Sequence, residues 1–329
     1  MNDIPMKENP KATVHGPEDG TWISWLGSPA QFLAIGTETD GTYCLSRAES
    51  APGGGAPPHT HDFEEGFFIL RGGITCVAGN RSFDLAPGQF LNVGSNVAHE
   101  LMNHGSEPAE MLIFAAPAGF DRFQMQGGTI VEDSKGPFLP PGAEDHVRIR
   151  EAAARHGVEL SPPPSAFNEP GRVTFRGEEE GLIIDTVGDR YRFLVTGEET
   201  GGKYALWEAL IGPNGGPPPH VHSREVEGFY VLDGELTFYT EERSFAAGPG
   251  TLVNLPRNSL HWFRNETDTT VRALIFVAPA GFEQMFLETG TRVGSWSDAL
   301  SPPDEEEKSR ILEVAPRYGV EIRRPTKDR

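Results

Sequence analysis

The chain has 329 residues and a formal net charge of −20, with 39 glycines and 28 prolines. This length allows two domains that each bury a core, and the negative charge argues against nucleic acid or an anionic membrane as a partner. No run of about 18 apolar residues could span a membrane, and residues 1–9 lack the apolar segment of a signal peptide. We therefore expect a cytoplasmic protein whose two cysteines, Cys44 and Cys76, are reduced and buried rather than joined in a disulfide.

Short β-like runs follow a polar N-terminal segment, residues 1–20, which we expect to be a flexible lead-in. The runs begin near Trp22, lack a helical apolar period and are separated by Gly, Asp and Asn. Clear examples are residues 31–36, 41–46, 73–78 and 89–93. Gly and Pro are spread along the whole chain, as in a turn-rich protein. The pattern predicts an all-β sandwich or small barrel.

Helical segments are few. A strand near Ile113 runs into a short helical turn, and a helix is predicted to begin at Ala143 and to end before Gly157. Acidic residues at its start, alanines within it and the glycine after it support this helix. The proline-rich residues 162–172 are typical of a linker, so we predict an N-terminal domain over 21–161 and a C-terminal domain over 173–329.

The second half of the chain repeats the first with an offset of about 162 residues. The segment Ile113–Phe120 recurs at Ile275–Phe282, and a second closing helix begins with an N-cap and prolines at residues 301–304 and ends before Gly319. A period this long indicates a duplicated domain rather than a solenoid. We expect the two copies to pack face to face, like a homodimer fused into one chain, and a homodimer of whole chains remains open.

His59, His61 and Glu65 are separated by even steps, so on a regular strand all three side chains lie on one face. His99, from a later strand, can join them. Three imidazoles and a carboxylate converging on one point form a candidate transition-metal site. By the same alternation Glu64 is expected to point away, toward solvent or a lid, as is Glu100.

A matching set occurs in the second half. Its members are His220, His222, Glu227 and His261. His222 and Glu227 are an odd step apart, so a bulge or local turn is needed to bring Glu227 inward. Six of the ten histidines belong to the two sets, which argues against ordinary, partly buried histidines. We predict about two divalent transition ions per chain, and Fe, Mn, Co, Ni and Cu all suit these ligands. Four ligands leave coordination positions open, which is the layout of a catalytic rather than a structural site.

Apolar residues continue the inward-facing positions beside both sets. The candidate pocket residues are Phe67, Ile69 and Leu101 in the first half and Phe229, Val231 and Phe263 in the second. Plain core packing is the competing interpretation for most of them. An apolar pocket beside a metal suits a small aromatic substrate. Asn103 and Asn265 are expected to form hydrogen bonds in turns or behind the ligands.

Both halves resemble the cupin superfamily, whose motifs are G-x5-H-x-H-x3,4-E-x6-G and G-x5-P-x-G-x2-H-x3-N. The matching stretches are His59–Gly72 and Gly88–Asn103 in the first half, and His220–Gly234 and Gly250–Asn265 in the second. Gly94 stands at the motif's proline, while Asn96 and Asn258 stand at its glycine, on turns where a left-handed backbone is tolerated. The resemblance implies a duplicated cupin fold, a double-stranded β-helix or jelly-roll barrel with short C-terminal helices on each copy.

Among two-domain cupins the chain is most similar to bacterial quercetin 2,3-dioxygenase-like proteins, through its length, its two ligand sets and its Ala-Pro-Ala-Gly-Phe segments. This similarity implies a metal-dependent dioxygenase that cleaves an aromatic enol such as a flavonol with O2 and releases carbon monoxide. Glu65 and Glu227 are then the candidate catalytic bases. The first site is favoured as the working one, because its ligand spacing needs no bulge.

Other interpretations compete with this one. A metal-dependent isomerase, cyclase or lyase that needs no O2 would use the same ligands. A ligand-sensing bicupin would bind a small molecule without a reaction, whereas two complete ligand sets and the lack of a signal peptide argue against a seed-storage-like bicupin. Oxalate decarboxylase, another two-domain cupin, is disfavoured because an apolar pocket and a negative chain suit a small dianion poorly.

Overall fold

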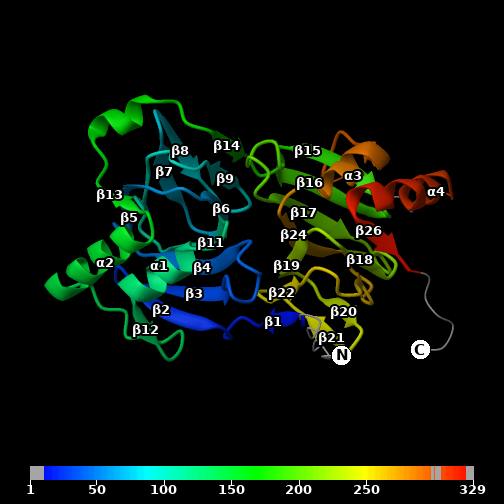
Figure 1. Cartoon of the computed structure of the whole chain (residues 1–329), viewed down its shortest axis with the longest axis horizontal. Helices are drawn as coiled ribbons and strands as arrows, with labels where there is room; N and C mark the ends of the chain where they lie inside the picture. Colours follow the sequence, from blue (N-terminus) through cyan, green and yellow to red (C-terminus); the bar gives the residue numbers. More distant parts are fainter. Residues whose placement is uncertain (1–10, 298–299, 301–304, 324–329) are drawn as a thin grey trace, which may run out of the picture. The chain divides into compact units, whose positions relative to one another are not determined.

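The computed structural model describes residues 11–297, 300 and 305–323 of the chain (Figure 1). By their internal contacts these residues form two compact units. The first contains His15–Leu182 and Arg192–Leu206, and the second contains Ile183–Tyr191 and the described residues from Trp207 onward, together with those before His15. Because the units interleave along the sequence, the linear boundary at residues 162–172 stays a prediction. No helix in the described part of the chain is long and apolar enough to cross a membrane.

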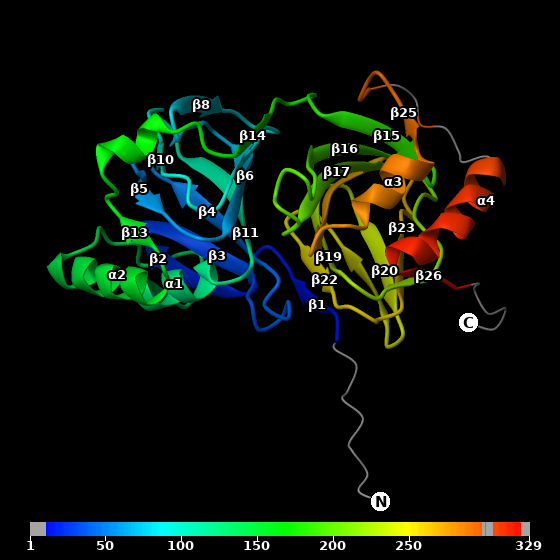
Figure 2. The same ribbon diagram turned by 45° about the horizontal axis from the view of Figure 1, so that its top comes forward.

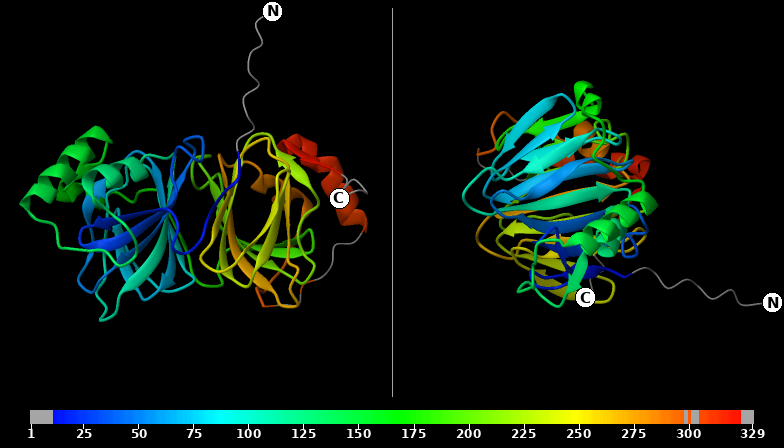
Figure 3. Two further views of the ribbon diagram at one scale, coloured as in Figure 1. Left: turned by 90° about the horizontal axis from the view of Figure 1, so that it is seen from below. Right: turned by 90° about the vertical axis from the view of Figure 1, so that its left-hand side faces the viewer.

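Two antiparallel sheets build the first unit and face each other as the walls of a barrel (Figure 3). The larger sheet has the order β12-β2-β3-β4-β11-β6-β9-β14, and the smaller has the order β13-β5-β10-β7-β8. Their strands are β2 (Thr21–Trp25), β3 (Ser28–Ala34), β4 (Cys44–Ser50), β5 (Gly55–Thr60), β6 (Glu64–Arg71), β7 (Ile74–Ala78), β8 (Arg81–Leu85), β9 (Phe90–Val93), β10 (His99–Met102), β11 (Ala109–Ala116), β12 (Thr129–Val131), β13 (Glu159–Leu160) and β14 (Val173–Arg176). Strand β7 buries every second residue, as a strand with one face on a core should.

The two remaining sheets repeat this arrangement and belong mainly to the second unit. The larger has the order β1-β22-β19-β24-β17-β16-β15-β25, and the smaller has the order β21-β20-β23-β18-β26. The strands are β1 (Thr13–His15), β15 (Leu182–Thr186), β16 (Asp189–Val195), β17 (Ala205–Ile211), β18 (His220–His222), β19 (Val226–Asp233), β20 (Leu236–Thr240), β21 (Ser244–Ala247), β22 (Leu252–Leu255), β23 (His261–Arg264), β24 (Val271–Ala278), β25 (Thr291–Arg292) and β26 (Val320–Ile322). The prediction of a duplicated, mostly β fold is confirmed.

Short helices follow the strands of each unit. They are α1 (Phe120–Gly127) and α2 (Ala143–Arg155) with the 3-10 helix η1 (Pro164–Asn168), and then α3 (Glu283–Thr289) and α4 (Glu305–Val314) with the 3-10 helix η2 (Ala315–Tyr318). Helix α2 begins where the sequence predicts, because the backbone N–H of Gly142 donates to the Asp145 carboxylate at 2.7 Å. Gly157 and Gly319 follow the two closing helices with left-handed backbone, as predicted. The proposed N-cap and prolines at residues 301–304 lie outside the described residues.

The core of the first unit fills the space between its sheets. Phe67, Leu91 and Ile113 are buried there, and so are Cys44 and Cys76, both as free thiols. Burial raises the pKa of both thiols, so they behave as small apolar residues. The expectation of two reduced, buried cysteines is confirmed in this structure.

Asn96 and Asn258 stand where the cupin motif has glycine, and both adopt left-handed backbone, with φ of 62° and 64°. The backbone N–H of Asn96 donates to the backbone carbonyl of His61 at 2.7 Å, and the backbone N–H of Asn258 donates to that of His222 at 2.8 Å. These turns therefore tie the loop before each last histidine to the second histidine of the same set. Asparagine tolerates this conformation better than other side chains do.

Candidate functional site

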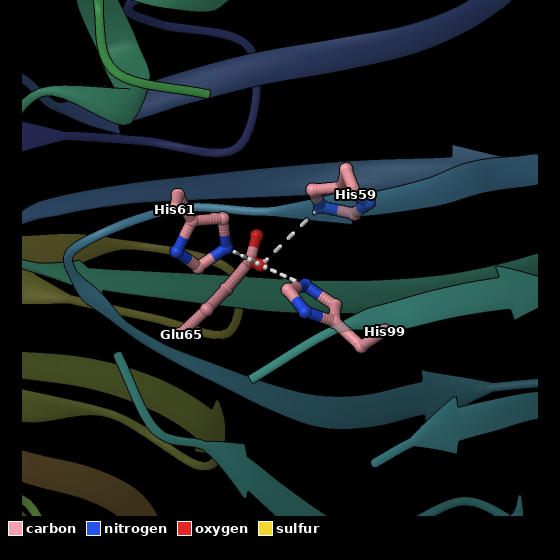
Figure 4. Close-up of side chains that lie close together, drawn as sticks. All are labelled: His59, His61, Glu65 and His99. Carbon is pink, nitrogen blue, oxygen red and sulfur yellow. Dashed lines mark hydrogen bonds and ion pairs between the residues drawn. The ribbon is translucent and has the colours of Figure 1, made fainter. Parts of the chain in front are cut away.

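The four predicted ligands of the first unit come from both of its sheets. His59 lies on β5 and His99 on β10, directly opposite each other in the smaller sheet, whereas Glu65 lies on β6 in the larger sheet. His61 follows the end of β5, where the chain crosses from one sheet to the other. The expectation that His59, His61 and Glu65 share one regular strand is therefore wrong, although their side chains still converge (Figure 4). The crossing occurs because two sheets must close one barrel, and alternation along a single strand does not describe it.

The side chains of this first centre are buried and meet at one carboxylate oxygen. Glu65 Oε2 lies 2.9 Å from Nε2 of both His61 and His99 and 4.0 Å from Nε2 of His59. The other ring nitrogen of each histidine, Nδ1, lies close to a backbone carbonyl oxygen. His59 Nδ1 is 2.8 Å from that of Pro57, His61 Nδ1 is 3.0 Å from that of Phe63, and His99 Nδ1 is 2.8 Å from that of Val97. Each Nδ1–H can therefore donate to a carbonyl, which leaves the Nε2 lone pair facing the centre.

This donor set fits a divalent transition ion. Three imidazole lone pairs beside an ionised carboxylate repel one another unless a cation lies between them. Burial lowers the pKa of His59 to about 3, so this imidazole is neutral, as a ligand must be. Burial alone would raise the pKa of Glu65, but the contacts with His61 and His99 outweigh it and hold that pKa below its usual range.

The second centre has the same ligand types, but its second histidine lies farther from the carboxylate than in the first centre. Glu227 Oε2 lies 3.0 Å from His261 Nε2, 3.5 Å from His222 Nε2 and 3.9 Å from His220 Nε2. The four donor atoms lie within 4.8 Å of one another, as in the first set, and all four residues are buried. Burial lowers the pKa of His220 to about 4. Residues 223–224 form a bend between β18 and β19, where the sequence predicts a bulge or local turn, and Glu227 lies inward after it.

A cavity of about 300 Å³ opens on the first centre, and His59 and Glu65 form part of its wall. Phe67 and Leu101 also line it, as predicted, whereas Ile69 is buried in the core and is not part of the wall. Among the wall residues that the sequence interpretation missed, six come from β2, α1 and α2. They are Trp25, Phe120, Phe123, Gln124, His146 and Ile149.

The cavity beside the second centre measures only about 50 Å³. Phe263 lines it, but Phe229 and Val231 are core residues outside its wall. Aromatic rings fill the remaining space: Tyr191 stacks on Phe286 with a centroid distance of 4.9 Å, and Trp207 meets Phe286 edge-on at 5.8 Å.

The duplication explains this difference in volume. In the aligned halves, Tyr191, Trp207 and Phe286 correspond to Ala30, Ser46 and Gln124. Three aromatic rings in the second unit thus replace two small side chains and an amide in the first. Comparison of the two repeats residue by residue is the sequence signal that could have identified the roomier site.

Two further side chains stand in unexpected surroundings. Glu64, expected to face solvent or a lid, is buried and accepts hydrogen bonds from Asn92 Nδ2 and the Ser95 N–H, both at 3.1 Å, and it pairs with Arg172. Gln124 is 3% exposed, and its Oε1 accepts no hydrogen bond from the described residues. An unpaired amide oxygen in a cavity wall is costly without a partner, so Gln124 can serve a bound molecule.

A family model described as "Cupin domain" matches the chain twice, over residues 46–115 and 207–277. Each match contains one complete ligand set. The chain contains two cupin domains. This cupin is 24% identical to quercetin 2,3-dioxygenase of Bacillus subtilis (strain 168) over 274 residues, which cover 79% of the chain and 80% of that protein.

Solved structures with the same fold differ in what they do. Lactobacillus farciminis oxalate decarboxylase matches 83% of this cupin with a TM-score of 0.54 and 14% identity, over 90% of its own chain. Procruciferin, an 11S globulin from Brassica napus, matches 83% with a TM-score of 0.55 and 12% identity, over 85% of its own chain. At these identities the likeness shows the fold alone, so the activity must be argued from the site.

Asn103 and Asn265 occupy turns, as expected, rather than the ligand sphere of either centre. Asn103 Nδ2 donates to the carbonyls of Ser50 and Glu107 at 2.8 Å and 2.9 Å. Asn265 Nδ2 donates to those of Ile211 and Thr269 at 2.8 Å and 2.7 Å. The motif asparagines therefore hold the turn that follows the strand of the last histidine in each set.

Proposed function

We propose that this cupin is a metal-dependent dioxygenase that cleaves an aromatic enol of the flavonol class with O2, and that the first centre carries the reaction. One observation supports this most strongly: a largely apolar cavity of about 300 Å³ has the carboxylate and a histidine of a complete ligand set in its wall. That volume lies at the lower end of cavities that hold drug-sized ligands, about 300–1,000 Å³. The relationship to a quercetin 2,3-dioxygenase supports the substrate class.

The residues of the cavity have separate tasks in this proposal. A divalent transition ion held by His59, His61, Glu65 and His99 would supply a Lewis acid that lowers the pKa of the enol hydroxyl and an open position for O2. In this proposal the Glu65 carboxylate, which borders the cavity, accepts the hydroxyl proton and returns it to the ring-opened product.

The rest of the wall orients the substrate and excludes water. The rings of Phe67, Phe120 and Phe123 form apolar surfaces suited to a flat aromatic molecule, and the Gln124 amide can accept a hydrogen bond from a hydroxyl on it. Overall, both oxygen atoms of O2 enter the product and one carbon of the enol ring leaves as carbon monoxide.

The experiment is a reaction of the metal-loaded protein with quercetin. We expect bleaching of the long-wavelength absorption, with O2 consumed and carbon monoxide released in equal amounts. The control is the same mixture under nitrogen. Equal conversion without O2 would replace the dioxygenase by an isomerase or lyase, and no conversion of any flavonol with any of the five metals would refute the substrate class.

A further inference from the structure

In the second centre a buried carboxylate faces Nδ1 of a ligand histidine, an arrangement that the first centre lacks. Glu225, just after the bend between β18 and β19, is 2% exposed, and its Oε2 lies 3.7 Å from Nδ1 of His222. This oxygen accepts no hydrogen bond from the described residues, and neither ring nitrogen of His222 has a hydrogen-bond partner there. A carboxylate oxygen of Glu225 and Nδ1 of His222 thus face each other in a buried position, at a distance too long for a hydrogen bond.

The corresponding ligand of the first centre is held differently. His61 Nδ1 lies 3.0 Å from the backbone carbonyl of Phe63. The connection from the second histidine to the carboxylate ligand is one residue longer in the second half, five steps instead of four. Both connections form a bend, at residues 62–63 and 223–224. The longer one places the Glu225 carboxylate where the first unit has the Phe63 carbonyl.

We infer that Glu225 is a positioning residue that accepts the Nδ1–H of His222 and so makes the second centre the tighter of the two metal sites. The shift needed is small, because a normal N–H···O distance is about 2.9 Å and the present separation is 3.7 Å. A carboxylate partner holds the proton on Nδ1, so that the lone pair of Nε2 faces the ion. It also makes the imidazole a more basic metal ligand than a carbonyl partner does. The five other ligand histidines, His59, His61, His99, His220 and His261, all have a backbone carbonyl at Nδ1.

The small cavity beside the second centre is consistent with a centre that holds its ion without binding substrate. With about 50 Å³ beside His220 and Glu227, the second centre has no room for an aromatic substrate. An ion that neither exchanges quickly nor meets substrate would stabilise its unit, as structural ions do. The inference depends on metal binding by both ligand sets and not on the reaction proposed above.

The test measures how fast each ion leaves the fully loaded chain. Protein loaded with Co(II) is mixed with excess chelator, and the loss of cobalt is followed by its visible absorption and by elemental analysis. We expect one fast and one slow phase of equal amplitude. His261→Ala should remove the slow phase, and His99→Ala should remove the fast one.

Variants at Glu225 then examine the carboxylate itself. Glu225→Ala should accelerate the slow phase about 10- to 100-fold, the usual effect of losing such a partner, and should change its absorption band. Glu225→Gln, which keeps the size and an accepting oxygen but not the charge, should fall between wild type and Glu225→Ala. Ser223→Ala, in the bend before Glu225, is the matched control and should leave both phases unchanged.

Several outcomes would overturn the inference. They are an unchanged slow phase in Glu225→Ala and Glu225→Gln with the fold intact by circular dichroism, a slow phase that disappears in His99→Ala instead, or equal rates at both centres in wild type. Because no substrate is present, the result is independent of whether the protein cleaves flavonols.

Discussion

His99 lies directly opposite His59 in the antiparallel pair β10–β5, and its ring centroid is 4.1 Å from that of His59. The same relationship joins His261 and His220 in the pair β23–β18, at 4.5 Å. Opposed positions on neighbouring strands keep side chains within contact distance, so the sheet itself brings two of the imidazoles together. The duplicated strands thus build two metal centres, and the differences between the centres come from the side chains around them.

The first prediction is that each centre binds one divalent ion. Protein reconstituted with Mn, Fe, Co or Ni should contain about two ions per chain, because both ligand sets are complete and buried. His99→Ala and His261→Ala should each retain about one. Elemental analysis checks the ratio, and a wild-type ratio at or below one for every metal would show that one set does not bind.

The second prediction concerns the two carboxylates. Glu65→Gln should lower kcat about 10²- to 10⁴-fold, the usual cost of losing a general base, because Glu65 borders the larger cavity. Glu227→Gln should leave kcat near the wild-type value, because the cavity beside it is too small for the substrate. Steady-state kinetics at matched metal content measure both. The opposite order of effects would move the reaction to the second centre.

The third prediction transfers a feature of the second unit to the first. Gln124→Phe places there the ring that Phe286 contributes to the small cavity, so it should fill the cavity and raise KM or abolish turnover, while the metal content stays the same. Gln126→Phe, at an exposed position of the same helix, is the matched control. Quercetin titrations under nitrogen, followed by fluorescence quenching, separate lost binding from lost chemistry. Unchanged binding in Gln124→Phe would show that substrate does not use this cavity.

Much of this arrangement follows from the sequence. The repeat, the turn residues and the motif spacings predict a duplicated β fold and both ligand sets, because side-chain alternation and positive-φ turns are local properties of the chain. Asn96 and Asn258 illustrate this, since each adopts the left-handed backbone expected of its turn.

Other features depend on parts of the chain that are distant in sequence. Glu64 was expected to face solvent or a lid, yet it is buried because it pairs with Arg172, a residue more than one hundred positions away. Similarly, α1 and α2 lie side by side (Figure 2) and supply cavity residues that no spacing rule connects to His59. Local alternation predicts which face a residue points to, but it does not predict what covers that face.

The last prediction is that the metal-free protein becomes less stable as the pH falls from 7 to 4. Burial lowers the pKa of His59 to about 3 and that of His220 to about 4, whereas an imidazole in the unfolded chain titrates near 6.5. Between these values the unfolded chain binds protons that the folded chain does not, so the free energy of unfolding decreases as the pH decreases. Each buried imidazole contributes a slope of about 1.4 kcal/mol per pH unit in this window.

Urea unfolding of the chelator-treated chain at several pH values measures this slope. His59→Gln should reduce the slope by the share of one imidazole, whereas His104→Gln, at an exposed position, should leave it unchanged. Metal-saturated protein should keep its stability to a lower pH, because protons must first displace an ion from the same nitrogen atoms. If His59→Gln and His104→Gln had the same slope as wild type, the acid sensitivity would come from groups outside the ligand sets, and protonation of the buried imidazoles would not be its cause.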